Sequence, residues 1–413
     1  MRKVILYVLM GIVVSAAFFS ISFTFLPKAI NSKIIFAGLG VLLFLYDTIK
    51  QGEFTLPKEI WGAMIIVSMF CVVGFIAADV NYTADYSYAT YFISFFTWLF
   101  ASYAVCWLIR TLHGKATLNL LVNYLAIVCV VQCLLALGID KYPALKLFVD
   151  RYVDQGQEFF TDVNRLYGVG VALDSAGVRF SMVLIMIPAV IFSSEDDGKI
   201  RGYAFLMLLA FFIISVIGNI ISRTTILGVI MGLVFLIVKM LTGAEQRSVV
   251  FKYFILLLFF FSAVSVFLYK TDKVYEEYFR FAFEGFFNFF ERGEWRTGST
   301  DKLNRTMWIW PETTQEWLIG TGLYDNWVYG TDIGYCRLIL YNGLIGFSVL
   351  VLFFLYQAYV FSCFFSEYVL LFVAFIVLAF LIWIKVSTDI FQIFAFFYFL
   401  DNSRGKSLFK MNV

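Results

Sequence analysis

Long apolar runs separated by polar connections dominate the chain. A helix that crosses the hydrocarbon core of a bilayer needs about 20 mostly apolar residues. Runs close to that length lie at roughly 4–25, 34–49, 60–79, 88–110, 117–138, 175–193, 201–221, 224–241, 250–269, 334–361, 367–385 and 388–400. The pattern predicts an all-α polytopic membrane protein with about twelve transmembrane helices, of which the second and the last are short.

Lysine and arginine residues predict which side of the membrane each connection occupies, because cytoplasmic loops carry an excess of them. With the N-terminus inside, the inner segments carry residues that include Arg2, Lys3, Lys50, Lys58, Arg110 and Lys115. The short outer connections carry only Lys28, Lys33, Arg223 and Lys385. Twelve crossings would return the chain to its starting side, so we expect both termini in the cytoplasm. The first apolar run is too long for a cleaved signal peptide and is expected to be a retained helix.

Two outer connections are long, at 139–174 and 270–333, within what we expect to be a single integral membrane domain over residues 1–413. In "VYEEYFRFAFEGFFNFFERGEW" of the second, helical spacing predicts one aromatic face, made of Tyr275, Phe279, Phe283, Phe286 and Phe290. Such a helix either lies in the headgroup plane of the membrane or packs against the membrane domain. Further on, we expect Pro311 to begin or kink a second helix that Gly320 and Gly322 end.

Composition narrows the class of protein. Of the 413 residues, 62% are hydrophobic and 15% are charged, whereas soluble domains are about half apolar and about a quarter charged. The net charge of +2 gives no reason to expect nucleic acid as a partner. His113 is the only histidine and the six cysteines form no CxxC pair, so the sequence predicts neither a metal site nor a disulfide framework.

Charged residues gather where the predicted helices meet the outer membrane face. These residues are Arg165, Asp174, Arg179, Arg223, Arg305, Asp332 and Arg337. Ionisable groups at membrane depth are rare and usually functional. Because a guanidinium fork meets two phosphate oxygens at once, converging arginines predict a site for a polyprenyl pyrophosphate headgroup whose tail stays in lipid.

Each of these residues also has a simpler interpretation. Arginines near an interface extend their head groups to water, which suits Arg179 better than Arg223, whose turn is too short to need solubilising. Asp332 stands at a helix start, where an N-cap stabilises a helix by about 0.5–2 kcal/mol. As a set, the arginines are also suited to binding anionic lipid without chemistry.

At these residues the sequence resembles the Wzy-type O-antigen and capsular polysaccharide polymerases, within the wider O-antigen ligase/polymerase superfamily. "SRTTILG" is similar to the superfamily's Ser-Arg turn before a helix, and "TGSTDKLNRTMWIW" followed by "LIGTGLYD" is similar to its arginine–tryptophan–glycine segment. "TDIGYCRLILYNGLIG" looks like the polymerase form of its helix start, and "NRLYGVGVALDSAGV" looks like its arginine-plus-glycine stretch. The motifs cover about 160–350. Outside them the resemblance rests on helix count.

One departure separates the polymerases from the ligases that move a finished chain onto lipid A core. Those ligases begin the corresponding helix with His-Asn. Aligned on Gly-Leu-Ile-Gly, their histidine falls on Asp332 of this chain, while His113 belongs to the predicted inner side. A carboxylate in place of the imidazole favours a polymerase.

The resemblance implies a GT-C-like glycosyltransferase of the bacterial inner membrane, with its active site facing the periplasm. The donor would be a growing glycan on undecaprenyl pyrophosphate and the acceptor a lipid-linked repeat unit, so that the product is O-antigen, capsule or exopolysaccharide. The resemblance also implies a metal-independent enzyme with no cofactor, and a chain-length regulator as partner. No Asp-x-Asp motif and no Walker loop occurs in the sequence.

The glycosyl transfer makes two chemical demands, and each one suggests roles for particular residues. The departing pyrophosphate builds negative charge, which positioned arginines stabilise, and we assign this task to Arg165, Arg223 and Arg305. The acceptor hydroxyl must lose a proton to a carboxylate, for which we favour Asp332, with Glu312 and Asp174 as alternatives. The remaining candidates for substrate contact are Arg337, which either orients Asp332 or meets pyrophosphate, Tyr335 at the glycan, and Arg179.

Other classes of protein remain open from the sequence. Twelve helices would also suit a flippase or transporter of lipid-linked oligosaccharide, although transporters usually place charges near the middle of the membrane. An O-antigen ligase or a protein O-glycosylating ligase would share the fold and the donor. A polymerase of the peptidoglycan shape and division class is a further alternative, which would show different loop motifs.

Overall fold

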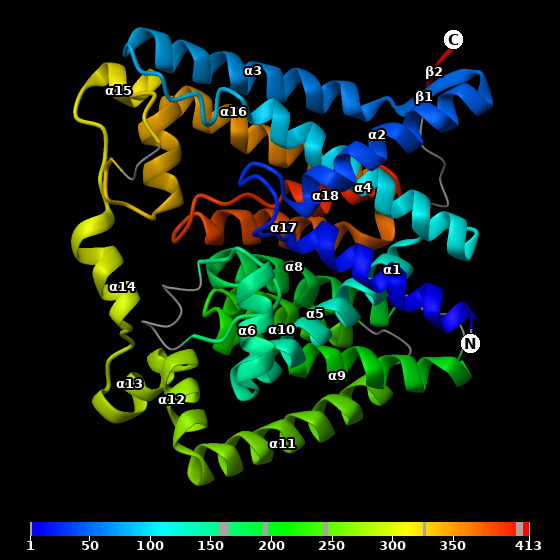
Figure 1. Ribbon diagram of the computed structural model, residues 1–413. Helices are drawn as coiled ribbons and strands as arrows, with labels where there is room; N and C mark the ends of the chain where they lie inside the picture. Colours follow the sequence, from blue (N-terminus) through cyan, green and yellow to red (C-terminus); the bar gives the residue numbers. More distant parts are fainter. Residues whose placement is uncertain are drawn as a thin grey trace. The chain divides into compact units, whose positions relative to one another are not determined.

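The computed structural model describes residues 2–156, 165–192, 197–242, 247–324, 328–401 and 408–412 (Figure 1). The chain divides into two compact units. The first comprises residues 1–35 and 108–296, and the second comprises residues 36–107 and 297–413. Each unit is described below by itself.

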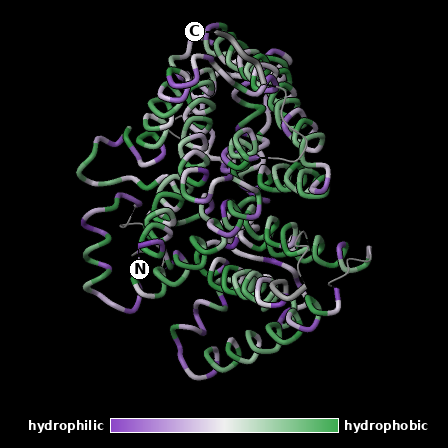
Figure 2. Tube along the Cα trace, turned by 90° about the vertical axis from the view of Figure 1, so that its right-hand side faces the viewer, coloured by the Kyte–Doolittle hydropathy of each residue, from purple (hydrophilic) through white to green (hydrophobic). Residues whose placement is uncertain are grey.

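Among the described residues, nine helices are long and apolar enough to cross a membrane, so the chain is an all-α multi-pass membrane protein as its hydrophobic pattern predicts. They are α1 (Arg2–Phe19), α2 (Ser32–Gln51), α3 (Glu59–Val80), α4 (Tyr91–His113), α5 (Leu118–Lys141), α8 (Leu173–Ile191), α9 (Asp197–Ile221), α11 (Arg247–Thr271) and α16 (Gly334–Phe364). Hydrophobic residues follow these helices along their length, and hydrophilic residues concentrate at their ends and connections (Figure 2).

Of the roughly twelve crossings predicted, with the second and the last short, nine correspond to long apolar helices among the described residues. Two further apolar helices are shorter, α10 (Thr225–Leu241) and α17 (Val369–Ile382), the latter preceded by the 3₁₀ turn η3 (Ser366–Tyr368). The last predicted crossing contains only the 7-residue helix α18 (Phe391–Phe397). At about 1.5 Å per residue, such a helix covers only a fraction of the roughly 30 Å hydrocarbon core.

The segment around α18 nevertheless runs along α4. The Tyr91 hydroxyl of α4 donates to the Asp389 carboxylate at 2.8 Å, and the ring of Tyr103 lies 5.1 Å from that of Phe399. Every residue of 390–400 is buried. Irregular backbone is tolerated at membrane depth where protein surrounds it, so this segment does not need a full helix.

In the first unit, α8 is the central helix. Almost all of its residues from Ala176 onward are buried, and it packs against α10, α9 and α5. Gly228 and Gly232 of α10 allow the closest approach, because a Cβ on Gly228 would lie 2.2 Å from the Cα of Ser181. This pair of small residues one helical turn apart is typical of tight helix packing in membranes.

The aromatic stretch of the 270–333 connection forms two helices rather than one. They are α12 (Lys273–Ala282) and α13 (Glu284–Arg292), and the break falls at Phe283. Of the predicted aromatic face, Phe279, Phe283, Phe286 and Phe290 line one cavity, so these four side chains do share a side. α12 packs against α9, as the second interpretation of the sequence expected. In the 139–174 connection, α6 is the helix Pro143–Tyr152.

In the second unit, α16 packs along α3 and also contacts α17 and α18. Its core is a cluster of rings from the last three helices: Phe361, Phe372, Phe375, Phe394 and Phe397. The 270–333 connection contributes α14 (Gly298–Lys302), the π-helical turn η1 (Leu303–Met307) and α15 (Thr314–Ile319) to this unit. The latter begins at a Thr313 cap rather than at Pro311, and ends at Gly320 as predicted.

A two-stranded sheet joins the C-terminal end of the chain to the connection between α2 and α3. Strand β1 (Glu53–Pro57) pairs antiparallel with β2 (Leu408–Asn412), with Glu53 opposite Asn412. The distribution of lysine and arginine predicts that both segments lie on the inner side. The pairing shows that they share one side of the membrane.

Candidate functional site

The turn between α9 and α10 fixes the position of Arg223. The Ser222 amide donates to the Gly218 carbonyl at 2.8 Å, and the Thr225 hydroxyl donates to the same carbonyl at 3.0 Å. Ser181 of α8 donates to the Thr224 carbonyl at 3.2 Å. These hydrogen bonds fix the backbone on both sides of Arg223. They therefore fix the position from which the Arg223 side chain extends.

A second loop, ahead of α8, carries Arg165. The buried Gln132 of α5 holds this loop by accepting from the Val169 amide at 3.0 Å and donating to the Val169 carbonyl at 3.2 Å. The Tyr167 hydroxyl donates to Asp150 of α6 at 2.8 Å. Side chains of two helices therefore position the loop that bears Arg165.

The two arginines meet at one aromatic ring. The Arg165 guanidinium lies 4.9 Å from the ring centre of Phe281, and the Arg223 guanidinium lies 4.4 Å from the same centre. Phe281 belongs to α12. The first residue of α13, Glu284, forms an ion pair with Arg223, whose side chain is 17% exposed. The structure thus brings together two of the three arginines predicted to bind pyrophosphate.

The charged groups around the Phe281 ring differ in whether they have hydrogen-bond partners. The Arg165 Nε is buried without a hydrogen-bond partner among the described residues. Burial, and next the charge of Arg223, lower the pKa of Arg165, while Asp174 acts in the opposite direction. Asp174 in turn accepts a hydrogen bond from the Thr224 hydroxyl. An anion bound between the guanidinium groups would offset their mutual repulsion.

Arg179 does not join this pair. It lies one turn further along α8, where it donates to the Ser175 carbonyl at 3.2 Å and lies 6.0 Å from the ring centre of Phe19. These two contacts are with its own helix and with α1.

The remaining predicted residues belong to the second unit, where the segments bearing Arg305 and Asp332 are tied to each other. The Thr331 hydroxyl donates to the Met307 carbonyl at 2.6 Å. Met307 also packs with Ile333 in a small buried cluster. The Thr331–Met307 hydrogen bond joins the two segments that carry Arg305 and Asp332. Both of these side chains are exposed.

The simpler interpretation of Asp332, as the N-cap of α16, is wrong. The cap position of α16 is Ile333, and its amide is accepted by the Thr331 hydroxyl at 3.1 Å. No side chain caps α16, so the Asp332 carboxylate does not begin the helix. Asp332 is exposed, and within the described part of the chain it has no hydrogen-bond partner.

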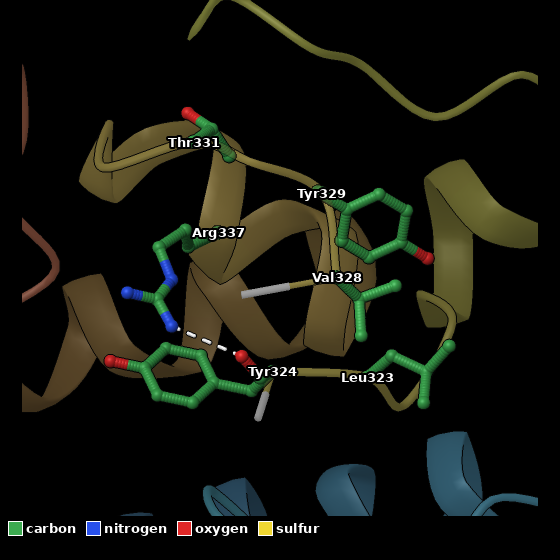
Figure 3. A pocket seen from close by; sticks show the side chains of 6 residues that line it. All are labelled: Leu323, Tyr324, Val328, Tyr329, Thr331 and Arg337. Carbon is green, nitrogen blue, oxygen red and sulfur yellow. Dashed lines mark hydrogen bonds between the residues drawn. The ribbon is translucent and has the colours of Figure 1, made fainter. Parts of the chain in front are cut away.

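Arg337 turns toward Tyr324 (Figure 3). Its guanidinium lies 3.7 Å from the ring centre of Tyr324 and donates to the Tyr324 carbonyl at 3.0 Å. The Tyr324 hydroxyl shares a 2.9 Å hydrogen bond with Ser387. Together with Leu323, Val328, Tyr329 and Thr331, these two residues line a cavity of about 10 Å³, enough for about one water molecule. The hydrogen bond of Arg337 therefore goes to this loop rather than to Asp332.

The Gly-Leu-Ile-Gly sequence of α16 is a break in the helix. Gly343 has φ 62° and ψ −173°, which is not a helical conformation. The carbonyls of Leu340 and Tyr341 accept instead from Thr321 at 2.6 Å and from Gly322 at 3.1 Å. The "IGTG" stretch and the Gly-Leu-Ile-Gly stretch, far apart in sequence, are thus one structural element that holds the loop leading to Asp332.

Two other candidates make local contacts. The half-buried Tyr335 donates its hydroxyl to the Phe380 carbonyl at 2.9 Å and packs on Trp383. Glu312 is exposed beside α15, where its amide donates to Glu316 at 2.9 Å. Neither contact identifies Tyr335 as a glycan ligand or Glu312 as a proton acceptor.

Sequence reasoning missed Phe281, Glu284 and Tyr324. The aromatic pattern that predicted the face of the outer loop left out Phe281, since this residue points away from that face. Glu284 is the only acidic residue in "RFAFEGFFNFF", and a lone carboxylate amid aromatic residues was the available signal. No group of three or more His, Cys, Asp or Glu side chains able to hold a metal occurs among the residues with described positions.

Comparison with protein-family models gives no match, and comparison with curated proteins gives none either.

Proposed function

We propose that this protein is a polysaccharide polymerase that transfers a growing glycan from undecaprenyl pyrophosphate to a lipid-linked repeat unit. The observation that carries the proposal is the arginine pair on Phe281 in a multi-pass membrane protein. Two guanidinium groups near one ring offer several N–H donors to the oxygens of a diphosphate, which would replace Glu284 as the partner of Arg223. The motif resemblance in the sequence supports the same class of reaction.

In this reaction the acceptor hydroxyl oxygen bonds to the anomeric carbon of the donor's first sugar. The bond from that carbon to the diphosphate breaks, and the diphosphate leaves on its lipid with the electron pair. Arg165 and Arg223 stabilise the negative charge that grows on the leaving group, and Arg305 is proposed for the same task. The proton of the acceptor hydroxyl passes to a carboxylate, for which Asp332 is the candidate.

The state of Asp332 supports its proposed role. A general base needs a free carboxylate that reaches a substrate hydroxyl. The exposed Asp332 side chain has no competing partner in the described part of the chain and no capping task. A carboxylate here, in place of a ligase's histidine, favours polymerisation over ligation. The proposed setting is the bacterial inner membrane, with the reaction on the periplasmic face and a chain-length regulator as partner.

Complementation tests the proposal. A strain that lacks the gene is expected to carry single-repeat products only, and the wild-type chain should restore a ladder of long glycans on a gel. Arg223→Ala and Arg305→Ala should be expressed normally and fail to restore it. Arg280→Ala is the matched control, because this exposed arginine of α12 pairs with Glu276 and Glu291 instead.

Two outcomes would contradict parts of this scheme. Loss of all surface glycan in the deletion strain would indicate a flippase or a ligase in place of a polymerase. A normal ladder from Arg223→Ala or from Arg305→Ala would remove that arginine from the mechanism while leaving the rest of the proposal standing.

A further inference from the structure

Three tryptophan side chains form a row on the surface of the second unit, in the 270–333 connection. The rings of Trp308 and Trp310 lie 5.6 Å apart, and those of Trp310 and Trp317 lie 5.8 Å apart at an angle of 16°. Trp308 and Trp310 are each 40% exposed. None of the three indole N–H groups has a hydrogen-bond partner in the described part of the chain. The tryptophan row therefore offers aromatic surface and N–H donors to a ligand.

The backbone holds the first two rings of the row outward. Met307 and Pro311 are buried and Ile309 is half-buried, whereas Trp308 and Trp310 between them are exposed. Successive side chains of an extended segment point to opposite sides, and the backbone of Trp308 is extended, with φ −78° and ψ 90°. Met307 and Ile309 pack in the buried cluster at the start of α16. Because packing fixes the inward residues, it also fixes the direction of the outward rings.

The start of α15 holds the third ring. The Glu316 carboxylate accepts from the Glu312 amide at 2.9 Å, and the Thr313 hydroxyl accepts from the Glu316 amide at 3.2 Å. These hydrogen bonds close the turn that leads into α15, so Trp317, which follows Glu316, keeps its position against Trp310. The row is formed before a ligand binds, which lowers the entropic cost of binding.

The charges beside the row disfavour two classes of partner. Residues 308–319 contain two glutamates and no lysine or arginine. Nucleic acid requires cations opposite its phosphates, and a segment that lies on an anionic bilayer carries lysine and arginine on its polar face. An uncharged chain rich in hydroxyl groups suits the row better. The C–H face of a sugar ring packs on an indole, whose face carries partial negative charge, and sugar hydroxyls donate to carboxylates.

We propose that the tryptophan row is a binding site for the glycan chain, separate from the groups that perform the transfer. The inference rests on the proposed function, which supplies the glycan. The row begins beside the segment of Asp332. Trp308 follows Met307, whose carbonyl accepts from the Thr331 hydroxyl at 2.6 Å, and Asp332 follows Thr331. A chain bound along the rings stays at a high effective concentration near the proposed base between transfers.

The test uses the full chain in nanodiscs and oligosaccharides released by mild acid from the surface glycan of the strain that carries the gene. In isothermal titration calorimetry, Trp310→Leu should weaken binding at least tenfold. Trp310→Tyr should restore most of it, because tyrosine supplies an aromatic face and leucine does not. Trp295→Leu is the matched control, since Trp295 is an exposed tryptophan of the same connection that packs on Phe286 instead. Thermal unfolding of each variant confirms that it is folded.

Fluorine NMR of the chain with fluorinated tryptophan separates glycan binding from membrane anchoring. The signals of Trp308 and Trp310, assigned with Trp308→Phe and Trp310→Phe, should shift when the oligosaccharides are added and stay sharp beside spin-labelled lipid. Broadening by the spin-labelled lipid would overturn the inference, since the rings would then lie in the bilayer interface. Equal binding by the wild type and Trp310→Leu, or no binding by the wild type, would also overturn it.

The tryptophan row and the polymerase activity can fail separately. If the arginine variants lose the glycan ladder while oligosaccharide binding does not depend on Trp310, the polymerase stands and the proposed glycan site falls. If the row binds oligosaccharides as described but the deletion strain makes normal chains, the glycan site stands and the polymerase proposal falls.

Discussion

The side chain of Asp332 makes no structural contact with the described residues. Thr331 binds both the Met307 carbonyl and the Ile333 amide, which leaves the neighbouring carboxylate exposed. A side chain in this situation contributes little to folding, so its substitution separates chemistry from stability.

We predict that Asp332→Asn keeps the melting temperature of the wild type and loses polymerisation. The amide has nearly the same shape and cannot accept the proton, and loss of a general base lowers a rate by about 10²–10⁴-fold. Gel analysis of glycans, together with extraction of lipid-linked donor, checks this, because donor should accumulate. Glu277→Gln, which changes an exposed carboxylate of α12 to which no role is assigned, serves as the control. Near-normal ladders from Asp332→Asn would assign the proton to another group.

The Arg165–Arg223 pair should respond to anions. Because burial and Arg223 lower the pKa of Arg165, its charged form is disfavoured in the folded protein, and a bound anion that favours the charged form stabilises the fold. We predict that pyrophosphate raises the melting temperature of the purified protein. At a concentration of 100 Kd the gain is about 2.7 kcal/mol.

Differential scanning fluorimetry in detergent measures this shift. Arg165→Ala should abolish it, and Arg280→Ala, on the surface of α12, should retain it. A shift that survives in Arg165→Ala would place the anion elsewhere on the protein.

Which residues form the site was only partly readable from the sequence. Arg165 and Arg223 stood out because each is a charged residue beside an apolar run. Phe281 and Glu284 did not, because their role depends on how α12 and α13 turn against the α9–α10 connection, and no local pattern encodes that contact. Arg337 was assigned a role at Asp332 or at pyrophosphate, and its nearest partner is the Tyr324 loop.

At the level of elements, the break in α16 links two glycine motifs. Gly343 adopts a conformation almost restricted to glycine, and the loop of Gly320 and Gly322 fills the gap that it leaves. The amino-acid pattern showed both motifs and could not show that they touch.

We predict that Gly343→Ala strongly lowers the thermal stability of the protein. A Cβ at this position would lie 2.2 Å from the Leu318 carbonyl oxygen, and the backbone conformation alone costs about 1–3 kcal/mol for a non-glycine residue. Gly38→Ala is the control, since a Cβ on Gly38 in α2 meets nothing within 4 Å. Thermal unfolding followed by fluorescence compares the two. Equal melting temperatures would mean that the break is not required for folding.

The lengths of elements were the less predictable part of the fold. Apolar runs located every long helix, because lipid demands about 20 apolar residues from a helix that crosses alone. The same rule overestimated the segment at 388–400, where surrounding protein replaces lipid and the helix shrinks to α18. Helical spacing likewise predicted one aromatic helix in the 270–333 connection. The chain instead forms two helices, α12 and α13, which meet at Phe283.

For the whole molecule, the pairing of β1 with β2 makes a testable statement about topology. We predict that Cys replacing Lys58, beside β1, is protected from a membrane-impermeant maleimide in intact spheroplasts, and that a C-terminal GFP fusion is fluorescent. Cys replacing Arg292, at the end of α13, should react without lysis. The tests use a Cys363→Ser background, because Cys363 is the exposed native thiol. Labelling of the Lys58 position from outside would reverse the orientation inferred from lysine and arginine.

The short, enclosed α18 has a consequence for biogenesis. A nascent chain normally partitions into the bilayer one apolar helix at a time, but a seven-residue helix flanked by turns would leave backbone groups facing hydrocarbon. This segment must instead insert between helices that have already left the translocon. Its cluster of phenylalanines would then close the core of the second unit only after α16 and α17 are in place, so a truncation that removes α18 should interrupt assembly more severely than the small size of this helix suggests.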